Sequence, residues 1–151
     1  MQGLKVVRFR LRGQVAYGLR QEGVVHALPS GPWEALQPGA AVAPLEEVQL
    51  LAPCRPSKVI AVGLNYAAHA AEAHAELPAE PVIFIKPPTT VVGPGEAIVY
   101  PAATSRWVEH EAELAVVIGR RARSVQRGEV PAVVAGYTCG NDVSARDLQR
   151  R

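Results

Sequence analysis

The feature that most constrains this chain is a series of short, alternating segments with a glycine at every corner. In residues 4–28, apolar and polar side chains alternate over short stretches that are separated by Arg12–Gly13 and Gln21–Gly23. Such alternation places the apolar side chains on one face of a half-buried strand, and glycine favours the tight turns between strands. A β-meander is therefore expected, with strands at residues 5–11, 15–19 and 24–28.

A proline- and glycine-rich stretch separates this meander from the rest of the chain. It covers residues 29–57 and ends in Pro53–Pro56, which resembles a linker. A chain of 151 residues can form one ordinary domain, or a small domain and part of a larger one. We therefore expect a small N-terminal β domain at residues 1–55 and a second unit at residues 56–151.

The second unit combines strands with an alanine-rich helix. Residues 66–76 have strong helix propensity, and Asn65 can cap that helix. Residues 129–137 favour a short helical start that is followed by a strand. Further strands are expected at residues 58–63, 82–85 and 111–118. The whole pattern predicts an α+β fold that is rich in β structure.

The composition is that of an ordinary soluble protein, for which the cytoplasm is the default location. Hydrophobic residues make up 48% and charged residues 20%, with a formal charge of +2, which gives no general attraction to nucleic acid or membranes. No apolar segment approaches the roughly 18–20 residues that span a bilayer, and residues 1–12 lack a signal-peptide core. Nucleic-acid binding through Arg146, Arg150 and Arg151 is a weak alternative, because acidic residues balance the basic ones. The two cysteines predict no disulfide framework.

Three carboxylates are the strongest candidates for chemistry. Glu111 and Glu113 are two positions apart in a predicted strand, so their side chains emerge on one face, roughly 6–7 Å apart. Taken alone, such a pair is more often a solvated strand face. Asp142 follows an apolar stretch at a strand-to-helix corner, where an Asx turn or an N-cap is the commoner role. Together the three would suit a hard cation: Mg²⁺, Mn²⁺ or Ca²⁺.

A histidine and a glutamate form a second candidate pair. His69 and Glu72 are three positions apart and would share one side of the predicted helix. A carboxylate that orients an imidazole can activate water, although a surface histidine on a helix is the more common situation. His74 lies off this helix face and His110 points away from the glutamate pair, so a structural role is expected for both.

Three further polar residues could contact an anionic substrate. Lys86 ends an apolar strand and could hold a carboxylate or an enolate, or it could be an ordinary strand-end lysine. Arg146 lies four residues after Asp142, and it could pair with that carboxylate or bind an anion. Gln149 is three residues further along and could donate to the same ligand.

Four segments in this order resemble the fumarylacetoacetate hydrolase family. Several matching motifs in sequence are far more specific than any one of them, and they cover nearly all of residues 57–151. The matching segments are VGLNYAAHAAE (62–72), EPVIFIKPPTTVVGPGEAI (80–98), EHEAELAVVIGRRAR (109–123) and VAGYTCGNDVSARDLQ (134–149).

The resemblance implies a role for each candidate residue. In the family, the E-x-E glutamates and the aspartate of the N-D-V-S-A-R-D segment are metal ligands, which match Glu111, Glu113 and Asp142. The histidine and glutamate of the N-Y-x-x-H-x-x-E segment form the base pair of many members, which match His69 and Glu72. Substrate-contacting positions match Lys86, Arg146 and Gln149.

The resemblance also implies a fold and an activity. The expected catalytic domain is a mixed β-roll behind a small N-terminal β domain, in a homodimer. The expected enzyme uses Mg²⁺, or else Mn²⁺ or Ca²⁺, to act on a 2-oxo acid or dicarboxylate through an enolate. An isomerase or C–C bond hydrolase of aromatic-acid catabolism, similar to 2-hydroxyhepta-2,4-diene-1,7-dioate isomerase, comes first. Acylpyruvate hydrolase and oxaloacetate decarboxylase are the alternatives.

The family pattern and this sequence differ in one respect. Catalytic domains of the family continue well past the A-R-D-L-Q segment, with further strands and a lysine and threonine that contact substrate. We therefore expect residues 1–151 to be a fragment, or else to take the remaining parts from a partner chain. A half-roll would leave strand edges and apolar faces uncovered, which predicts poor solubility or self-association. An inactive binding or assembly module is the alternative of another class.

Overall fold

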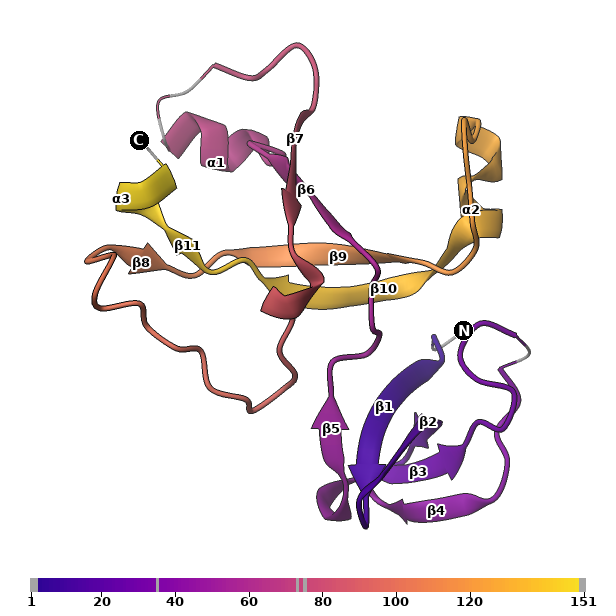
Figure 1. Cartoon of the computed structure of the whole chain (residues 1–151). Helices are drawn as coiled ribbons and strands as arrows, with labels where there is room; N and C mark the ends of the chain where they lie inside the picture. The colour runs from indigo at the N-terminus through magenta and orange to yellow at the C-terminus, as the bar shows by residue number, and fades with distance from the viewer. Residues whose placement is uncertain (1–2, 35, 73, 75, 150–151) are drawn as a thin grey trace. The chain divides into compact units, whose positions relative to one another are not determined.

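A computed structural model describes residues 3–34, 36–72, 74 and 76–149 of the chain. Within them, one five-stranded sheet and three two-stranded sheets are joined by short helices, which confirms the predicted β-rich α+β fold. The sheets are open (Figure 1). Two compact units can be separated, one formed by residues 1–54 with 93–151, and the other by residues 55–92.

The N-terminal part forms the five-stranded antiparallel sheet, in the order β4-β3-β2-β1-β5. The turn between β1 and β2 has positive φ at both Arg12 (49°) and Gly13 (82°). Such a two-residue turn matches the right-handed twist of the strands that it joins, so the predicted meander is confirmed. The strands are β1 (Lys5–Leu11), β2 (Gln14–Gln21), β3 (Val24–Ala27), β4 (Ala41–Pro44) and β5 (Gln49–Leu51).

This sheet has its own small apolar core. Phe9, Val25, Ala43 and Val48 are buried together, and Val48 follows the 3-10 helix η1 (Leu45–Glu47). Burial of these side chains removes apolar surface from water and stabilises the sheet. The last two strands, β4 and β5, lie within the stretch that the sequence pattern assigned to a proline- and glycine-rich connection. The core therefore extends further along the chain than the meander.

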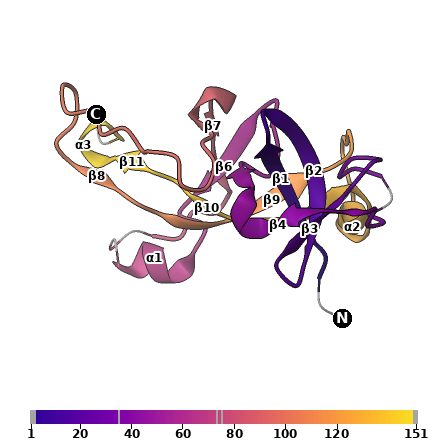
Figure 2. The ribbon, with the colours of Figure 1, turned by 90° about the horizontal axis from the view of Figure 1, so that it is seen from below.

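A long antiparallel pair, β9 (Ala112–Ile118) with β10 (Val134–Asn141), supports the candidate site. The two strands lie side by side along their length (Figures 1 and 2). Between them come η3 (Arg127–Glu129) and α2 (Val130–Val133). Residues 129–137 thus contain a short helix followed by a strand, as predicted.

A second, much shorter antiparallel pair is formed by the strand before β9 and the strand after β10. β8 (Val108–Glu109) pairs with β11 (Ser144–Ala145), and α3 (Arg146–Gln149) follows directly. One hydrogen bond beyond the ladder, from the Arg146 N–H to the Trp107 carbonyl oxygen (2.8 Å), continues this pairing. The start of α3 is therefore fixed against the strand that carries Glu109.

Residues 55–92 contain a two-stranded sheet and the alanine-rich helix. β6 (Val59–Gly63) and β7 (Val82–Lys86) lie where the apolar runs predicted strands, and they pair with each other; η2 (Pro88–Thr90) follows. The helix α1 (Ala67–Glu72) is shorter than the predicted 66–76. His74 has a left-handed backbone (φ 51°), and its N–H bonds to the Ala71 carbonyl three residues earlier. Because that conformation cannot continue an α-helix, the prediction was too long.

Candidate active site

The two glutamates of the E-x-E segment lie at the start of β9. Glu111 immediately precedes the strand and Glu113 lies in it. Burial alternates along β9, so that Glu113 is half-buried while Ala112 and Leu114 are exposed. Glu111 is half-buried as well. The half-buried face of β9 therefore begins with both carboxylates, as alternation with period two requires.

Asp142 lies opposite Glu111. Its N–H donates to the Glu111 carbonyl oxygen (2.9 Å), one step beyond the last pair of the ladder, Asn141 with Ala112. Residues opposite each other in an antiparallel pair direct their side chains to the same face. Asp142 is also half-buried, so backbone pairing brings three carboxylates to one face of two strands. α3 begins only at Arg146, which separates Asp142 from the N-cap position.

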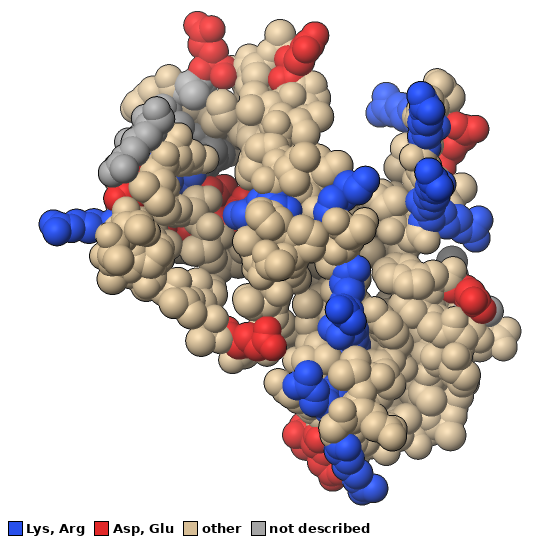
Figure 3. Space-filling model, in the orientation of Figure 1, with Lys and Arg blue, Asp and Glu red and all other residues tan. Residues whose placement is uncertain are grey.

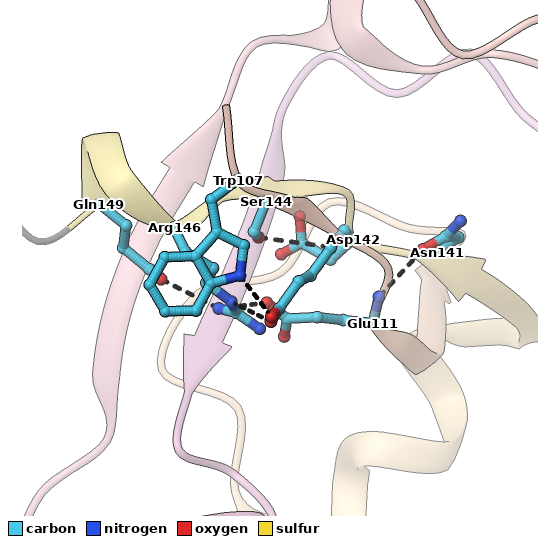
Figure 4. Close-up of polar contacts among 8 residues, drawn as sticks. Trp107, Glu111, Asn141, Asp142, Ser144, Arg146 and Gln149 are labelled. Atoms are coloured by element: carbon cyan, nitrogen blue, oxygen red, sulfur yellow. Dashed lines mark hydrogen bonds and ion pairs between the residues drawn. The ribbon is translucent and has the colours of Figure 1, made fainter. Parts of the chain in front are cut away.

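Asn141 fixes the backbone at this corner. Its side-chain oxygen Oδ1 accepts the backbone N–H of Glu111 at 3.1 Å. The Ser144 hydroxyl donates to the carbonyl oxygen of Asp142 at 3.3 Å (Figure 4). These two bonds hold the β10–β11 corner against the start of β9. Asn141 is not among the site residues that the sequence predicted, although short polar side chains at such corners often bond to nearby backbone.

Arg146 joins the carboxylate face to α3. Its Nε donates to Glu109 Oε2 (2.9 Å), and its Nη1 lies 2.8 Å from Glu111 Oε1. Nη1 also donates to Gln149 Oε1 (2.9 Å), so the guanidinium lies between Gln149 and Glu111 (Figure 4). The side chain of Arg146 is only 13% exposed. The structure therefore pairs Arg146 with Glu111 and Glu109, whereas the sequence offered pairing with Asp142 or binding of an anion.

The pKa of Arg146 is raised above its usual value. The hydrogen bond to Glu109 is the largest cause; loss of hydration on burial opposes it, and the charges of Glu111 and Glu109 add to the rise. Arg146 is therefore a permanent positive charge that is shared between two carboxylates. An anionic ligand could accept hydrogen bonds from the same guanidinium.

The donor set on this face fits a hard divalent cation in chemistry and in backbone placement. Carboxylate oxygens on Glu111, Glu113 and Asp142 are ligands of the kind that Mg²⁺ and Mn²⁺ prefer. Their side chains, however, are not gathered: in the described part of the chain, no three His, Cys, Asp or Glu residues form a group that could hold a metal ion. Glu111 instead directs Oε1 to Arg146 (2.8 Å). The metal assignment of these residues stays a prediction.

The carboxylate of Asp147 in α3 anchors the segment before β8. Asp147 accepts hydrogen bonds from the Ser105 hydroxyl (2.6 Å) and the Arg106 N–H (3.0 Å). These bonds lower the pKa of the Asp147 carboxyl, and the bond from Ser105 has the largest effect. Ser105 is buried, and its oxygen also accepts the N–H of Trp107 (3.3 Å). This contact could not be predicted from the sequence, because Ser105 and Asp147 are 42 positions apart.

The remaining candidates lie in the unit formed by residues 55–92. Glu72 is the last residue of α1 and is exposed, and Lys86 is the half-buried last residue of β7. The backbone of His69 lies within α1, but its side chain lies outside what the structure describes. The pairing of His69 with Glu72 and the substrate contact of Lys86 therefore stay predictions.

The distribution of charge and the hydropathy of the helices bear on nucleic-acid and membrane binding. Basic and acidic side chains occur in small, separate groups on the face shown in Figure 3. Arg150 and Arg151, which were considered for nucleic-acid binding, lie outside the described residues. In the described part of the chain, no helix is long and apolar enough to cross a membrane.

Comparison with known families decides the identity of the fold. Residues 58–151 match the family model described as fumarylacetoacetate (FAA) hydrolase C-terminal, and residues 4–53 match the model described as Rv2993c-like, N-terminal. The chain belongs to the fumarylacetoacetate hydrolase family. The predicted resemblance is thereby confirmed, and the matched range contains every candidate site residue.

Several relatives in this family carry enzyme names. Oxaloacetate tautomerase Fahd2a, mitochondrial, of Rattus norvegicus is 40% identical over 147 residues, which are 97% of this chain and 43% of that protein. The 5-carboxymethyl-2-hydroxymuconate delta-isomerase from Mycobacterium smegmatis has a TM-score of 0.83 at 42% identity, covering 96% of this chain and 57% of that one. Maleylpyruvate hydrolase from Sphingobium sp. SYK-6, solved with manganese (II) and pyruvate, has a TM-score of 0.71 at 26% identity and covers 93% and 59%.

The chain thus spans less than half the length of the curated relatives that it matches, between 34% and 43% in those compared. Its share of the solved chains is 56–59%.

Proposed function

We propose that the protein acts on 2-oxo acids through an enolate, with a divalent cation held by the carboxylate face of β9 and β10. The observation that carries this proposal is the placement of three half-buried acids, Glu111, Glu113 and Asp142, on one face. Arg146 lies against that face and offers a fixed positive charge for the substrate carboxylate. The enzyme names of the relatives agree with such a site.

Each proposed residue has a role of its own. The cation, Mg²⁺ first and Mn²⁺ or Ca²⁺ otherwise, would stabilise negative charge on the keto oxygen of the substrate. Arg146 would bind the substrate carboxylate through its guanidinium, and Gln149 would donate to the same ligand. Lys86 would stabilise the enolate, as a positive charge at the end of a strand can. His69 and Glu72 would take up a proton from the substrate or from water.

The reaction is proposed to be isomerisation or C–C bond hydrolysis of the kind found in aromatic-acid catabolism. If His69 takes a proton from the carbon next to the keto group and the resulting enolate is protonated again at another atom, the double bond moves and an isomerase results. If it takes a proton from water, the hydroxide formed attacks the second carbonyl and the adjacent C–C bond breaks, with its electron pair going to the enolate of pyruvate. His69 then returns its proton to that enolate, so that an acylpyruvate is cleaved to a carboxylic acid and pyruvate. The name oxaloacetate tautomerase of the rat relative favours the first outcome for small dicarboxylates. Oxaloacetate decarboxylation is the remaining alternative.

A titration with two metals tests this function. We expect Mg²⁺ and Mn²⁺ to bind the protein with one site in calorimetry, and oxaloacetate or acylpyruvate turnover to require the bound metal. Metal and dicarboxylate binding without turnover of any of these acids would instead favour the inactive binding or assembly module. Turnover that is unchanged after exhaustive treatment with a chelator would exclude the proposed function.

Domain division and location belong to the same proposal. We place a small β domain at residues 1–55 and the first part of the catalytic domain at residues 56–151. The matches of separate family models to residues 4–53 and 58–151 support this division. The cytoplasm is the proposed location, and nucleic acids and membranes are not proposed as partners.

We also propose that the chain self-associates through the second face of β9 and β10, in keeping with the expected homodimer. Val116 is 49% exposed and its cross-strand neighbour Tyr137 is 67% exposed, and Leu114 lies on the same face. Contiguous exposed apolar side chains of this kind usually mark an interface. In sedimentation velocity we expect wild type to associate, and Val116→Lys to lower the association constant by about 10-fold or more, since a lysine would be desolvated at the interface.

The matched control for this prediction is Val15→Lys. Val15 is a similarly exposed valine (46%) of a strand, but it lies in the N-terminal sheet. The Val15→Lys substitution should therefore leave the association constant unchanged. A wild-type chain that stays monodisperse and melts cooperatively as a monomer would contradict the predicted interface.

A further inference from the structure

Glu109 contacts Trp107 and Arg146 with its two carboxylate oxygens. Oε1 accepts the indole N–H of Trp107 at 2.6 Å, and Oε2 accepts the Nε–H of Arg146 at 2.9 Å. Both distances are short, as expected when the acceptor is ionised. Glu109 is neither a proposed metal ligand nor a proposed substrate contact, although it lies two positions before Glu111.

The hydrogen bond from Arg146 Nε to Glu109 determines where the two terminal nitrogens of the guanidinium point. A carboxylate at Nε fixes the plane of the fork, and the terminal nitrogens then point in a defined direction. In this structure Nη1 meets Glu111 Oε1 (2.8 Å) and Gln149 Oε1 (2.9 Å). Glu109 therefore holds Arg146 from one side while the opposite side meets the proposed substrate-binding and metal-binding residues.

The backbone around Glu109 is well anchored. Glu109 lies opposite Ser144 in the β8–β11 pair, and Arg146 donates its N–H to the Trp107 carbonyl oxygen (2.8 Å). Asp147, the next residue of α3, is bonded to the buried Ser105 hydroxyl (2.6 Å). Because the strand and the helix are joined at these points, the carboxylate of Glu109 has a defined place beside Nε of Arg146.

We propose that Glu109 is a positioning residue, which holds Arg146 at Nε so that its terminal nitrogens face the carboxylate of a 2-oxo acid substrate. Trp107 has the supporting role, because its indole N–H fixes the other oxygen of Glu109. This inference rests on the proposed function for the identity of the substrate. The orientation of Arg146 by Glu109 can be measured without any substrate.

Whether anion affinity rises or falls when Glu109 is replaced by glutamine distinguishes a positioning role from a purely electrostatic one. If Glu109 contributes only negative charge, its replacement by glutamine should tighten the binding of an anion. If it positions Arg146, the same replacement should weaken binding, because glutamine puts an NH₂ donor in place of one of the two oxygens that accept from Trp107 and Arg146. Loss of one charge-assisted hydrogen bond predicts about a 10-fold lower affinity.

The experiment is an NMR titration of the whole chain with pyruvate in the presence of Mg²⁺. The Nε–H resonance of Arg146, assigned by its loss in Arg146→Lys, should be protected from solvent exchange in wild type. In Glu109→Gln we expect faster exchange of this proton and about 10-fold weaker pyruvate binding. Trp107→Phe, which removes only the indole donor, should weaken binding by about 3-fold, since a neutral donor contributes less.

A matched glutamate serves as the control. Glu47 is exposed and lies in η1 of the N-terminal sheet, so Glu47→Gln should leave pyruvate affinity and the Arg146 resonance unchanged. Equal or tighter pyruvate binding in Glu109→Gln would overturn the positioning role. If that variant does not fold, Trp107→Phe carries the test, and unchanged pyruvate affinity in it would count against the proposal.

The two proposals fail in different ways. If wild type binds no pyruvate with either Mg²⁺ or Mn²⁺, the proposed function is wrong. The Nε–H exchange then still decides whether Glu109 holds Arg146: protection in wild type that persists in Glu109→Gln excludes it. If wild type binds pyruvate and Glu109→Gln binds it equally well, only the role of Glu109 is wrong.

Discussion

Replacing Glu113 by alanine is expected to abolish the metal-dependent turnover of 2-oxo acids. Glu113 lies in β9 opposite Gly140, where the neighbouring strand contributes no side chain that could take over a ligand position. Loss of one of three acidic ligands should lower the affinity for Mg²⁺ by about 100-fold and kcat by roughly 10²–10³-fold. Calorimetric titration with Mg²⁺ and an assay with oxaloacetate at saturating metal measure the two effects separately.

Two further variants sharpen this test. Glu113→Gln preserves the shape of the side chain but removes its charge, so it should bind Mg²⁺ nearly as poorly as the alanine variant. Glu47→Ala changes an exposed glutamate of η1 and should behave as wild type. Because Glu113 is half-buried beside an apolar strand, neither Glu113→Ala nor Glu113→Gln should lower the thermal midpoint substantially. Activity that survives in chelator-treated Glu113→Ala would exclude Glu113 as a ligand.

Local patterns predicted most of the strands, because their causes lie close together in the sequence. Alternation over residues 5–11, 14–21 and 24–27 and a glycine at each turn are sufficient to specify the meander. The switch from α2 to β10 is equally local: Pro131 lies in the first turn of α2, a position where proline is tolerated. The β-branched residues after it favour a strand.

The elements that were missed or misjudged depend on distant partners. β4 and β5 have only four and three residues, and each forms because a strand of the meander, β3 or β1, offers it a free edge. Nothing in a three-residue segment such as Gln49–Leu51 reveals that it pairs with β1. The predicted helix at 66–76 relied on alanine propensity alone, which tertiary context and a left-handed His74 override.

The candidate site shows the same division between local and distant causes. The E-x-E spacing predicted that Glu111 and Glu113 share a face, and burial along β9 agrees with it. Pairing of Asp142 with Glu111 and of Arg146 with Glu109 required the register of two ladders, which the sequence does not contain. The alternation of acids at 109, 111 and 113 was nevertheless a signal that could have identified Glu109.

Replacing Arg146 by methionine is expected to move metal affinity and substrate affinity in opposite directions. Arg146 Nη1 occupies Glu111 Oε1 at 2.8 Å, so the guanidinium and a cation compete for one carboxylate. Removing the positive charge should strengthen Mg²⁺ binding by about 10-fold, since a unit charge about 4 Å away contributes between about 1 kcal/mol in water and about 4 kcal/mol near a protein surface. The same change should lower kcat/KM for a 2-oxo acid by about 100-fold.

Thermal stability gives an independent measurement of the same charge balance. Without Arg146, Glu109 and Glu111 lose their shared partner, so the variant should melt below wild type in metal-free buffer. Added Mg²⁺ should then raise the midpoint more in Arg146→Met than in wild type, because the cation binds the folded state more tightly. Arg123→Met, which changes an exposed arginine of the turn after β9, is the matched control and should show neither effect. If Arg146→Met binds Mg²⁺ more weakly than wild type, Glu111 is not shared between the guanidinium and a metal.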